Sequence, residues 1–169
     1  MKNLMPFLLL LAVCCSACST TRIYIVRHGE RLNSSDTTSL SEMGHERAET
    51  LALVLADKDI DSIFVSDYAR TRQTAQPTAD RLNLPLTTYN PRPAELIASR
   101  LKNIKNKNVL VVGHSDTILE VAKRLETTPT RSKIEGTDFD NFLVVRIKRT
   151  FGHKKTTLQE LTYGRQTPP

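Results

Sequence analysis

Three separate segments of the sequence place an arginine or a histidine at or just beyond the end of a short apolar stretch. Arg27 and His28 follow the first stretch, Arg70 lies just beyond the second, and His114 follows the third. Planar guanidinium groups bind phosphate oxygens in pairs and neutralise the charge that shifts during phosphoryl transfer. A neutral imidazole can attack phosphorus and later leave, which divides one difficult reaction into two easier ones. These residue types fit phosphoryl-transfer chemistry, provided that the three segments meet in space.

The stretches before these residues have the composition of buried strands, because they are rich in β-branched and apolar side chains. Strands are expected at residues 22–26, 63–65, 86–89, 109–112, 142–147 and 156–161, the last two as a hairpin. Helices are expected after the capping-box pair Ser39 and Glu42, and over residues 68–82, 94–104 and 116–125.

This alternation of strands and helices predicts an α/β fold of three layers, with a mainly parallel sheet and helices on both faces. Ligands bind to such sheets at the carboxyl ends of the strands. Arg27, His28 and His114 stand at such ends, and Arg70 comes shortly after the strand that finishes at Ser66. We therefore expect these side chains to converge on one rim of the sheet.

Four blocks along the chain strengthen this expectation. They are RHGE at residues 27–30, LSEMG at 40–44, SDYARTRQTA at 66–75 and VVGHS at 111–115. In these blocks and their order, the chain from residue 22 to about residue 148 resembles the histidine phosphatase superfamily. The resemblance implies a phosphoglycerate mutase-like fold.

The resemblance also implies the chemistry of the site. His28 is expected to be the nucleophile that becomes phosphohistidine, with Arg27, Arg70 and His114 around the phosphate. The neighbouring arginines should lower the pKa of His28 and keep its ring neutral, and Gly29 should let the backbone approach the ligand. No metal site and no cofactor are expected, because the four histidines of the chain lack ligand spacing.

The residue that protonates the leaving group is open at the level of sequence. Glu95 lies between the second and third apolar stretches, where mutase-like members of the family place their acid. Asp116 follows His114 by two residues, although it could equally cap a helix. Glu30 adjoins His28. Glu95 is the first choice among these three.

The first 17 residues have the pattern of an export signal. Lys2 precedes the apolar run 4–13, which is too short to span a bilayer, and small residues lead to Cys18. The segment resembles a bacterial lipoprotein signal, which implies lipid on Cys18. The expected organisation is a signal peptide at 1–17, a tether at 18–21, a phosphatase domain at 22–163 and a tail at 164–169. All three cysteines lie at or before Cys18, so no disulfide is expected in the domain.

Charge is distributed unevenly along the chain, whose net charge is +6. Residues 18–99 carry nine basic and eleven acidic side chains, whereas residues 100–169 carry fourteen basic and seven acidic ones. The basic half is either a solvated surface or an attractor of phosphorylated substrates or anionic lipid. Aromatic residues are not interleaved with it, so nucleic acid is not an expected partner.

Taken together, these patterns predict a metal-independent phosphomonoesterase, exported to the cell envelope and anchored to a membrane by lipid. Its expected partner is a phosphorylated small molecule or a phosphoprotein, including one phosphorylated on histidine. The alternative from another class is an envelope protein that binds phosphorylated ligands without catalysis. Such a binder could dispense with His28 or with the acid, and both types of residue are present.

Overall fold

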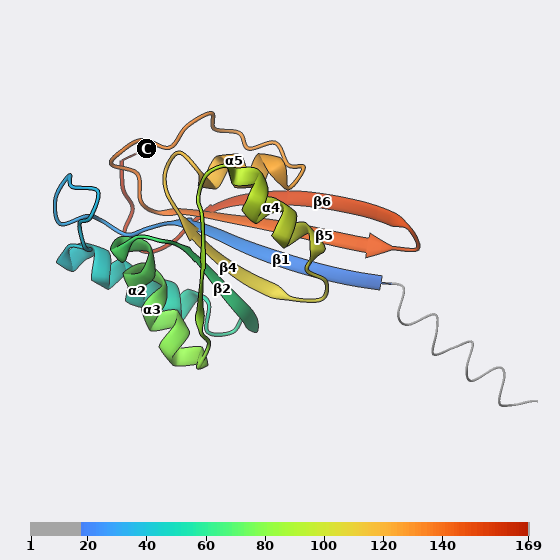
Figure 1. Cartoon of the computed structure of the whole chain (residues 1–169), viewed down its shortest axis with the longest axis horizontal. Coiled ribbons are helices and arrows are strands. Elements are labelled where there is room, and N and C mark those ends of the chain that lie inside the picture. The colour runs from blue at the N-terminus through green and yellow to red at the C-terminus, as the bar shows by residue number, and fades with distance from the viewer. Residues whose placement is uncertain (1–17, 169) are drawn as a thin grey trace, which may run out of the picture.

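The computed structural model describes residues 18–168, which form one six-stranded sheet with helices packed against it (Figure 1). The predicted signal peptide at residues 1–17 lies outside the described residues. In chain order the elements are β1 (Cys18–Arg27), α2 (Glu42–Val54), β2 (Ile60–Ser66), α3 (Ala69–Leu82), β3 (Leu86–Tyr89), α4 (Ala94–Asn103), β4 (Asn108–Gly113), α5 (Ile118–Arg124), β5 (Asn141–Thr150) and β6 (His153–Thr162). No helix within the described range is both long enough and apolar enough to cross a bilayer.

The strand order in the sheet is β3-β2-β4-β1-β5-β6. The first four of these strands run parallel, while β5 lies antiparallel to β1 and β6 antiparallel to β5. This arrangement confirms the predicted mainly parallel sheet and the terminal hairpin. Because β4 lies between β1 and β2, the carboxyl ends of these three strands meet at one rim of the sheet.

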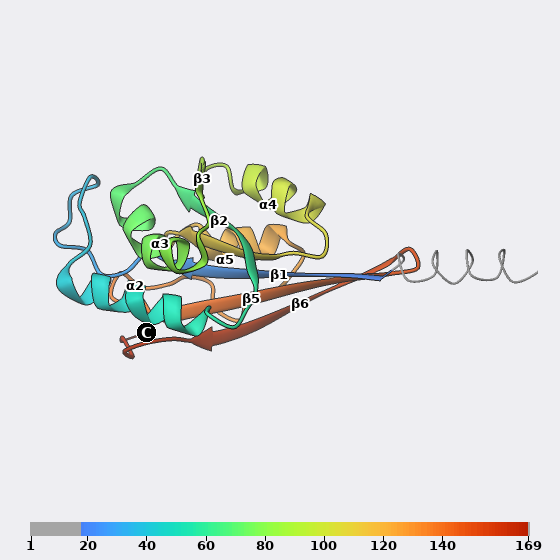
Figure 2. The same cartoon turned by 90° about the horizontal axis from the view of Figure 1, so that it is seen from below.

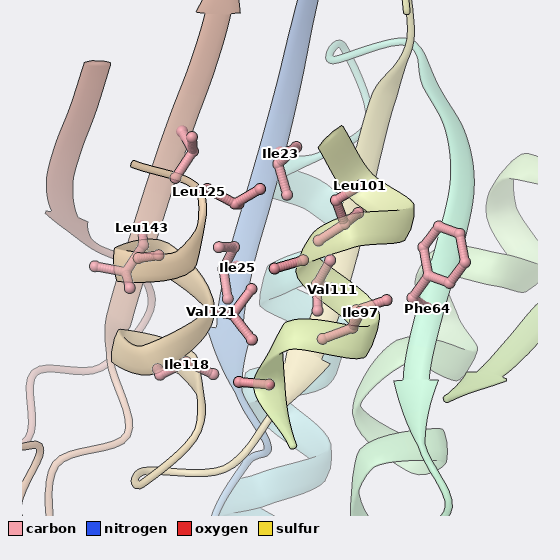
Figure 3. Close-up of a cluster of buried hydrophobic side chains, with 14 of the residues drawn as sticks. Ile23, Ile25, Phe64, Ile97, Leu101, Val111, Ile118, Val121, Leu125 and Leu143 are labelled. Carbon is pink, nitrogen blue, oxygen red and sulfur yellow. The ribbon is translucent and has the colours of Figure 1, made fainter. Parts of the chain in front are cut away.

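Helices cover both faces of the sheet, which confirms the three-layer prediction (Figure 2). On one face α4 and α5 bury side chains such as Ile97, Leu101 and Val121 against the strands (Figure 3). On the other face α2 and α3 contribute a second core. Both cores are built from residues between Ile23 and Tyr163. A chain that starts at Cys18 therefore keeps the whole hydrophobic core.

The start of the domain differs from the prediction. Residues 18–21, expected to be a free tether, are the first residues of β1 and pair with the end of β5. The Thr21 hydroxyl is buried and donates a hydrogen bond to the Ile104 carbonyl at 3.0 Å. The segment is ordered as strand because β5 continues to Thr150 and offers its backbone groups as far as Cys18.

The other chain segments show two smaller differences. Helix α2 is capped by Ser41, whose hydroxyl accepts the Gly44 N–H at 3.2 Å, and the expected Ser39 is not the cap. The tail that was expected beyond residue 163 is attached to the domain. The Thr167 hydroxyl accepts the N–H groups of Phe139 and Asp140.

Candidate active site

A pocket of about 320 Å³ opens at the rim where β1, β2 and β4 end. Arg27, His28, Arg70 and His114 all line it, so the structure brings together the four residues that the sequence singles out. The ring centroids of His28 and His114 are 5.3 Å apart. The remaining lining residues are Arg31, Asp36, Tyr68, Pro91, Arg92, Ser115, Asp116 and Gly136.

His28 is oriented by a single backbone contact. Its Nδ1 lies 2.7 Å from the Gly29 carbonyl oxygen and donates a hydrogen bond to it, so Nε2 keeps its lone pair. Burial lowers the pKa of His28 to about 3, with smaller contributions from Arg27, His114 and Arg70, while the bond to Gly29 opposes the shift. The ring is therefore neutral near pH 7, as expected. Burial, rather than the neighbouring arginines, is the main cause.

Arg27 is held by the loop at residues 135–138, which the sequence analysis did not identify as part of the site. Its guanidinium donates to the carbonyls of Glu135 at 2.8 Å, Gly136 at 3.0 Å and Asp138 at 2.7 Å. It also lies over the Phe139 ring, 3.9 Å from the ring centre. Burial lowers the pKa of Arg27 to about 10, so the group is still charged at neutral pH.

Arg70 and His114 are linked to each other. The Arg70 Nη2 donates to His114 Nδ1 at 3.4 Å, and its Nη1 donates to the Asp36 carbonyl. The His114 Nε2–H donates to the Ser66 hydroxyl at 2.8 Å. Burial lowers the pKa of His114 to about 4, and Arg70 is the next contributor. The Tyr68 ring packs under the Arg70 guanidinium at 4.4 Å.

Two nitrogen atoms in this pocket lack a partner. The Nε–H groups of Arg27 and Arg70 are buried, and neither has an acceptor among residues 18–168. A buried donor without an acceptor costs free energy, more so when the group is charged. An oxyanion bound between the two guanidinium groups would supply acceptors. The pocket is thus suited to an anionic ligand.

The structure places Glu95, the first choice for the proton donor, on α4 and outside the pocket lining. Its carboxylate pairs with Arg124 of α5 at 2.8 Å, because both side chains project from neighbouring helices on one face of the sheet. Half of each side chain is exposed to solvent. In this arrangement the Glu95 carboxylate is engaged by Arg124 and does not contribute to the pocket.

The other two carboxylates have distinct positions. Glu30 is buried and accepts three hydrogen bonds of 2.7–3.0 Å from the guanidinium of Arg47, so its oxygen atoms are fully engaged. Asp116 lines the pocket and pairs with Arg92. Asp116 is thus the one of the three sequence candidates that the pocket contains.

Gly29 is needed for a reason other than the expected one. A Cβ at this position would stand 2.8 Å from the Gly44 carbonyl oxygen of α2. The absence of a side chain lets the loop after β1 pack directly on the start of α2. The close approach is therefore to protein backbone and not to the ligand.

Sequence reasoning missed Arg31 and Arg92, which add two cations to the pocket. Both carried a weak signal, since Arg31 follows His28 by three residues and Arg92 stands between two prolines. Against the four arginines in the lining stand the carboxylates Asp36 and Asp116, so positive charge is in excess. Within residues 18–168, no three His, Cys, Asp or Glu side chains gather as metal ligands would.

Comparison with known proteins adds independent evidence. A sequence model described as the histidine phosphatase superfamily (branch 1) matches residues 23–91. The probable phosphoglycerate mutase GpmB of Yersinia pestis (strain Pestoides F) is 35% identical over 89 residues, which are 48% of this chain and 41% of that protein. The chain thus matches less than half the length of these curated relatives.

Solved structures share the fold over most of the chain. A putative alpha-ribazole-5'-P phosphatase from Escherichia coli K-12 has a TM-score of 0.62 at 18% identity, covering 84% of this chain and 96% of its own. The protein histidine phosphatase SixA, solved with tungstate, has a TM-score of 0.61 at 22% identity and covers 83% and 96%. The matched motif, the fold and the clustered Arg27, His28, Arg70 and His114 agree: residues 23–91 match the histidine phosphatase superfamily, and the described chain has the fold of the solved phosphatases.

Proposed function

We propose that this protein hydrolyses phosphate monoesters by way of a phosphoryl group carried on Nε2 of His28. The observation that supports this most directly is the combination of a neutral, oriented His28 with two buried guanidinium groups whose Nε–H donors lack acceptors. A phosphate dianion would satisfy those donors and stand next to the imidazole. Solved relatives of the same fold carry the names of phosphatases.

The first step is phosphoryl transfer to the protein. The Nε2 lone pair of His28 attacks phosphorus, the P–N bond forms and the bond from phosphorus to the leaving oxygen breaks. The charge on the equatorial oxygens is neutralised by Arg27 and Arg70. Because Nδ1–H already donates to the Gly29 carbonyl, positive charge that develops on the ring is stabilised by that contact.

The second step returns the enzyme to its starting state. A water molecule attacks the phosphohistidine, the P–N bond breaks and inorganic phosphate leaves. We assign the proton transfers to Asp116, which gives its proton to the leaving oxygen and takes one back from the attacking water. Its position in the pocket lining supports this role.

The decisive test replaces the nucleophile. The chain from Cys18 onward, assayed with p-nitrophenyl phosphate in the presence of a chelator, should turn over, and His28→Ala should lose at least about 10³-fold in kcat because the covalent route is closed. His45→Ala, on an exposed residue of α2 outside the pocket lining, is the matched control and should keep full activity. The trapped phosphoenzyme should be labile in acid and stable in base.

Other results would point elsewhere. Undiminished turnover in His28→Ala, or a phosphoryl group trapped on serine or aspartate, would remove the proposed mechanism. Tight binding of inorganic phosphate without any turnover would favour the non-catalytic envelope protein that binds phosphorylated ligands.

A second candidate is the removal of phosphate from phosphohistidine in proteins. Asp116 is engaged in an ion pair with Arg92, so its carboxyl group is less free to protonate a leaving group. A leaving group of low basicity needs less help from an acid. Phosphohistidine with a protonated ring releases neutral imidazole, which is such a group, so it would suit this pocket better than an alkyl phosphate. Direct comparison of a phosphohistidine peptide with an alkyl phosphate distinguishes the two.

We also propose that the protein is exported and carries lipid on Cys18. The apolar run before Cys18 supports export, and Cys18 is exposed at the far end of β1 from His28, where a lipid would leave the pocket open. Mass spectrometry of the mature protein should find an acylated Cys18 at the amino terminus. A free terminus at a later residue would end this proposal.

A further inference from the structure

The start of β1 and the turn between β5 and β6 form a three-stranded end that projects beyond the helices (Figures 1 and 2). Cys18 pairs with Thr150 there, and Thr150 pairs with His153 across the turn. This end is opposite the pocket, because β1 runs ten residues from Cys18 to Arg27. At about 3.3 Å per residue, the two ends lie roughly 30 Å apart.

Four exposed cations are paired across the strands near this end. Arg22 of β1 stands opposite Arg146 of β5, and Lys148 of β5 stands opposite Lys155 of β6. Directly opposed residues share a face of the sheet, and so do residues two apart along a strand. The four side chains therefore lie on one face, which we call the basic face.

These pairs are unfavourable for folding, because like charges directly opposite each other destabilise a sheet. None of the four forms an ion pair with a carboxylate of residues 18–168. The turn after α2 brings Asp57 and Asp59 near Tyr24 on this side of the sheet, and Asp57 is paired with Lys58. Lys154, on the other face of the hairpin, does have a partner in Glu126. On that face Arg149, opposite Lys154, donates to the Lys102 carbonyl. The basic face differs in that all four of its cations are exposed and none has a carboxylate partner among residues 18–168.

Protection of a sheet edge does not account for this surface. Lysines on edge strands prevent sheets from pairing with each other, and this explains Lys155 on the edge strand β6. It does not explain Lys148 and Arg146 on β5, or Arg22 on β1, because these strands have neighbours on both sides. A partner that carries negative charge is the remaining physical reason.

The tip of the hairpin adds an apolar group to the same end. Phe151 is 66% exposed and has a φ of 47°, in the left-handed region that asparagine and glycine favour in such turns. A bulky aromatic residue gains nothing for the fold from such a site. Aromatic rings beside cationic side chains are, however, typical of surfaces that rest on lipid headgroups.

We propose that the basic face and Phe151 bind the surface of an anionic lipid bilayer. Lysine and arginine near such a surface are attracted by its negative potential, and the Phe151 ring enters the headgroup region. The lipid proposed on Cys18 would attach at the same end, but binding through these side chains does not depend on acylation. The bilayer would then lie on the side of the molecule away from the pocket, which stays open to soluble substrates.

Because the chain contains no tryptophan, a single introduced tryptophan reports only on its own surroundings. Phe151→Trp, in the chain from Cys18 with Cys18→Ser, places one fluorophore at the tip. Vesicles of phosphatidylglycerol and phosphatidylcholine should shift its emission to shorter wavelength, and pure phosphatidylcholine vesicles should not. An emission maximum that does not move with either kind of vesicle would overturn insertion at the tip.

Charge reversal tests the basic face. Lys148→Glu/Lys155→Glu should weaken binding to the anionic vesicles by about thirtyfold or more, since each cation contributes roughly fivefold near such a surface. The two glutamates of the variant stand opposite each other as the two lysines did, so the repulsion between like charges in the sheet is similar in the variant and the unaltered chain. The control Lys123→Glu/Lys133→Glu changes net charge equally at two neighbouring lysines near α5 and should bind almost as tightly as the unaltered chain.

Equal losses in both double variants would show that only net charge matters and would refute the basic face. Binding to a single-stranded oligonucleotide as tight as to the vesicles would reassign the surface to nucleic acid. Hydrolysis of p-nitrophenyl phosphate by Lys148→Glu/Lys155→Glu should be unchanged. Failure of vesicle binding therefore leaves the proposed catalysis standing, and failure of catalysis leaves the membrane surface standing.

Discussion

His28 and His114 are both buried in the pocket, but their ring nitrogens are held in opposite ways. His28 donates from Nδ1 to the Gly29 carbonyl, whereas His114 donates from Nε2 to the Ser66 hydroxyl. The free nitrogen of His114 already accepts from Arg70, while Nε2 of His28 has no such partner within residues 18–168. This difference in tautomer favours His28 as the nucleophile and leaves His114 as a residue that positions Arg70.

Substitution of Asp116 tests whether this residue is the proton donor. Asp116→Asn should lower kcat/KM for an alkyl phosphate by about a hundredfold, because the alkoxide would leave without a proton. The same variant should have little effect on p-nitrophenyl phosphate, whose leaving group is weakly basic. Glu95→Gln is the matched control and should change neither rate, since Glu95 faces Arg124. Steady-state kinetics with the two substrates decide the matter.

The opposite pattern is equally informative. A hundredfold loss in Glu95→Gln, with Asp116→Asn unaffected, would mean that α4 moves toward the pocket during turnover and would restore the expectation drawn from sequence.

Among the elements, a buried ion pair connects the loop after β1 to α2 and to the end of the chain. Arg47 of α2 donates to both oxygen atoms of Glu30, and also to the carbonyls of Tyr163 and Arg165. The exposed fractions of the two side chains are 1% for Arg47 and 9% for Glu30. Glu30 thus stabilises the position of the loop that carries His28, rather than taking part in proton transfer.

Removal of one partner should therefore reduce stability. Glu30→Gln leaves the Arg47 charge buried without its carboxylate and should lower the free energy of unfolding by about 3 kcal/mol. Urea denaturation followed by circular dichroism measures this loss. If instead stability is unchanged and kcat falls by two orders of magnitude, Glu30 has a chemical role that its hydrogen bonds argue against.

The strands show where reasoning from sequence is accurate and where it is not. Residues 86–89 and 109–112 were predicted almost to the residue. The second is a short apolar run, and the first is a β-branched and aromatic run with Pro85 before it and Pro91 shortly after it, so both have clear limits. Strands β5 and β6 run several residues further than predicted. Their outer halves are polar and lack the apolar pattern of a buried strand, and only pairing within the hairpin extends them.

On the scale of the whole molecule, the pocket and the proposed membrane-binding surface lie toward opposite ends of the sheet. The pocket lies at the carboxyl ends of the parallel strands, and Cys18, Phe151 and the basic face lie near the other. The sheet connects them, with β1 running from one end to the other. Under both proposals, the pocket would lie at the end of the sheet away from the bilayer, with roughly 17 Å of β1 between Arg22 and Arg27.

The sequence by itself determined the order of strands and helices, the three-layer arrangement and the set Arg27, His28, Arg70 and His114. These follow from hydrophobic patterns and from motifs at strand ends, which are local properties. Only the tertiary structure decided that Glu95 faces Arg124 and that residues 18–21 belong to the sheet. Contacts between segments far apart in the chain, such as β1 with β5, depend on which faces pack together, and no local pattern carries that information.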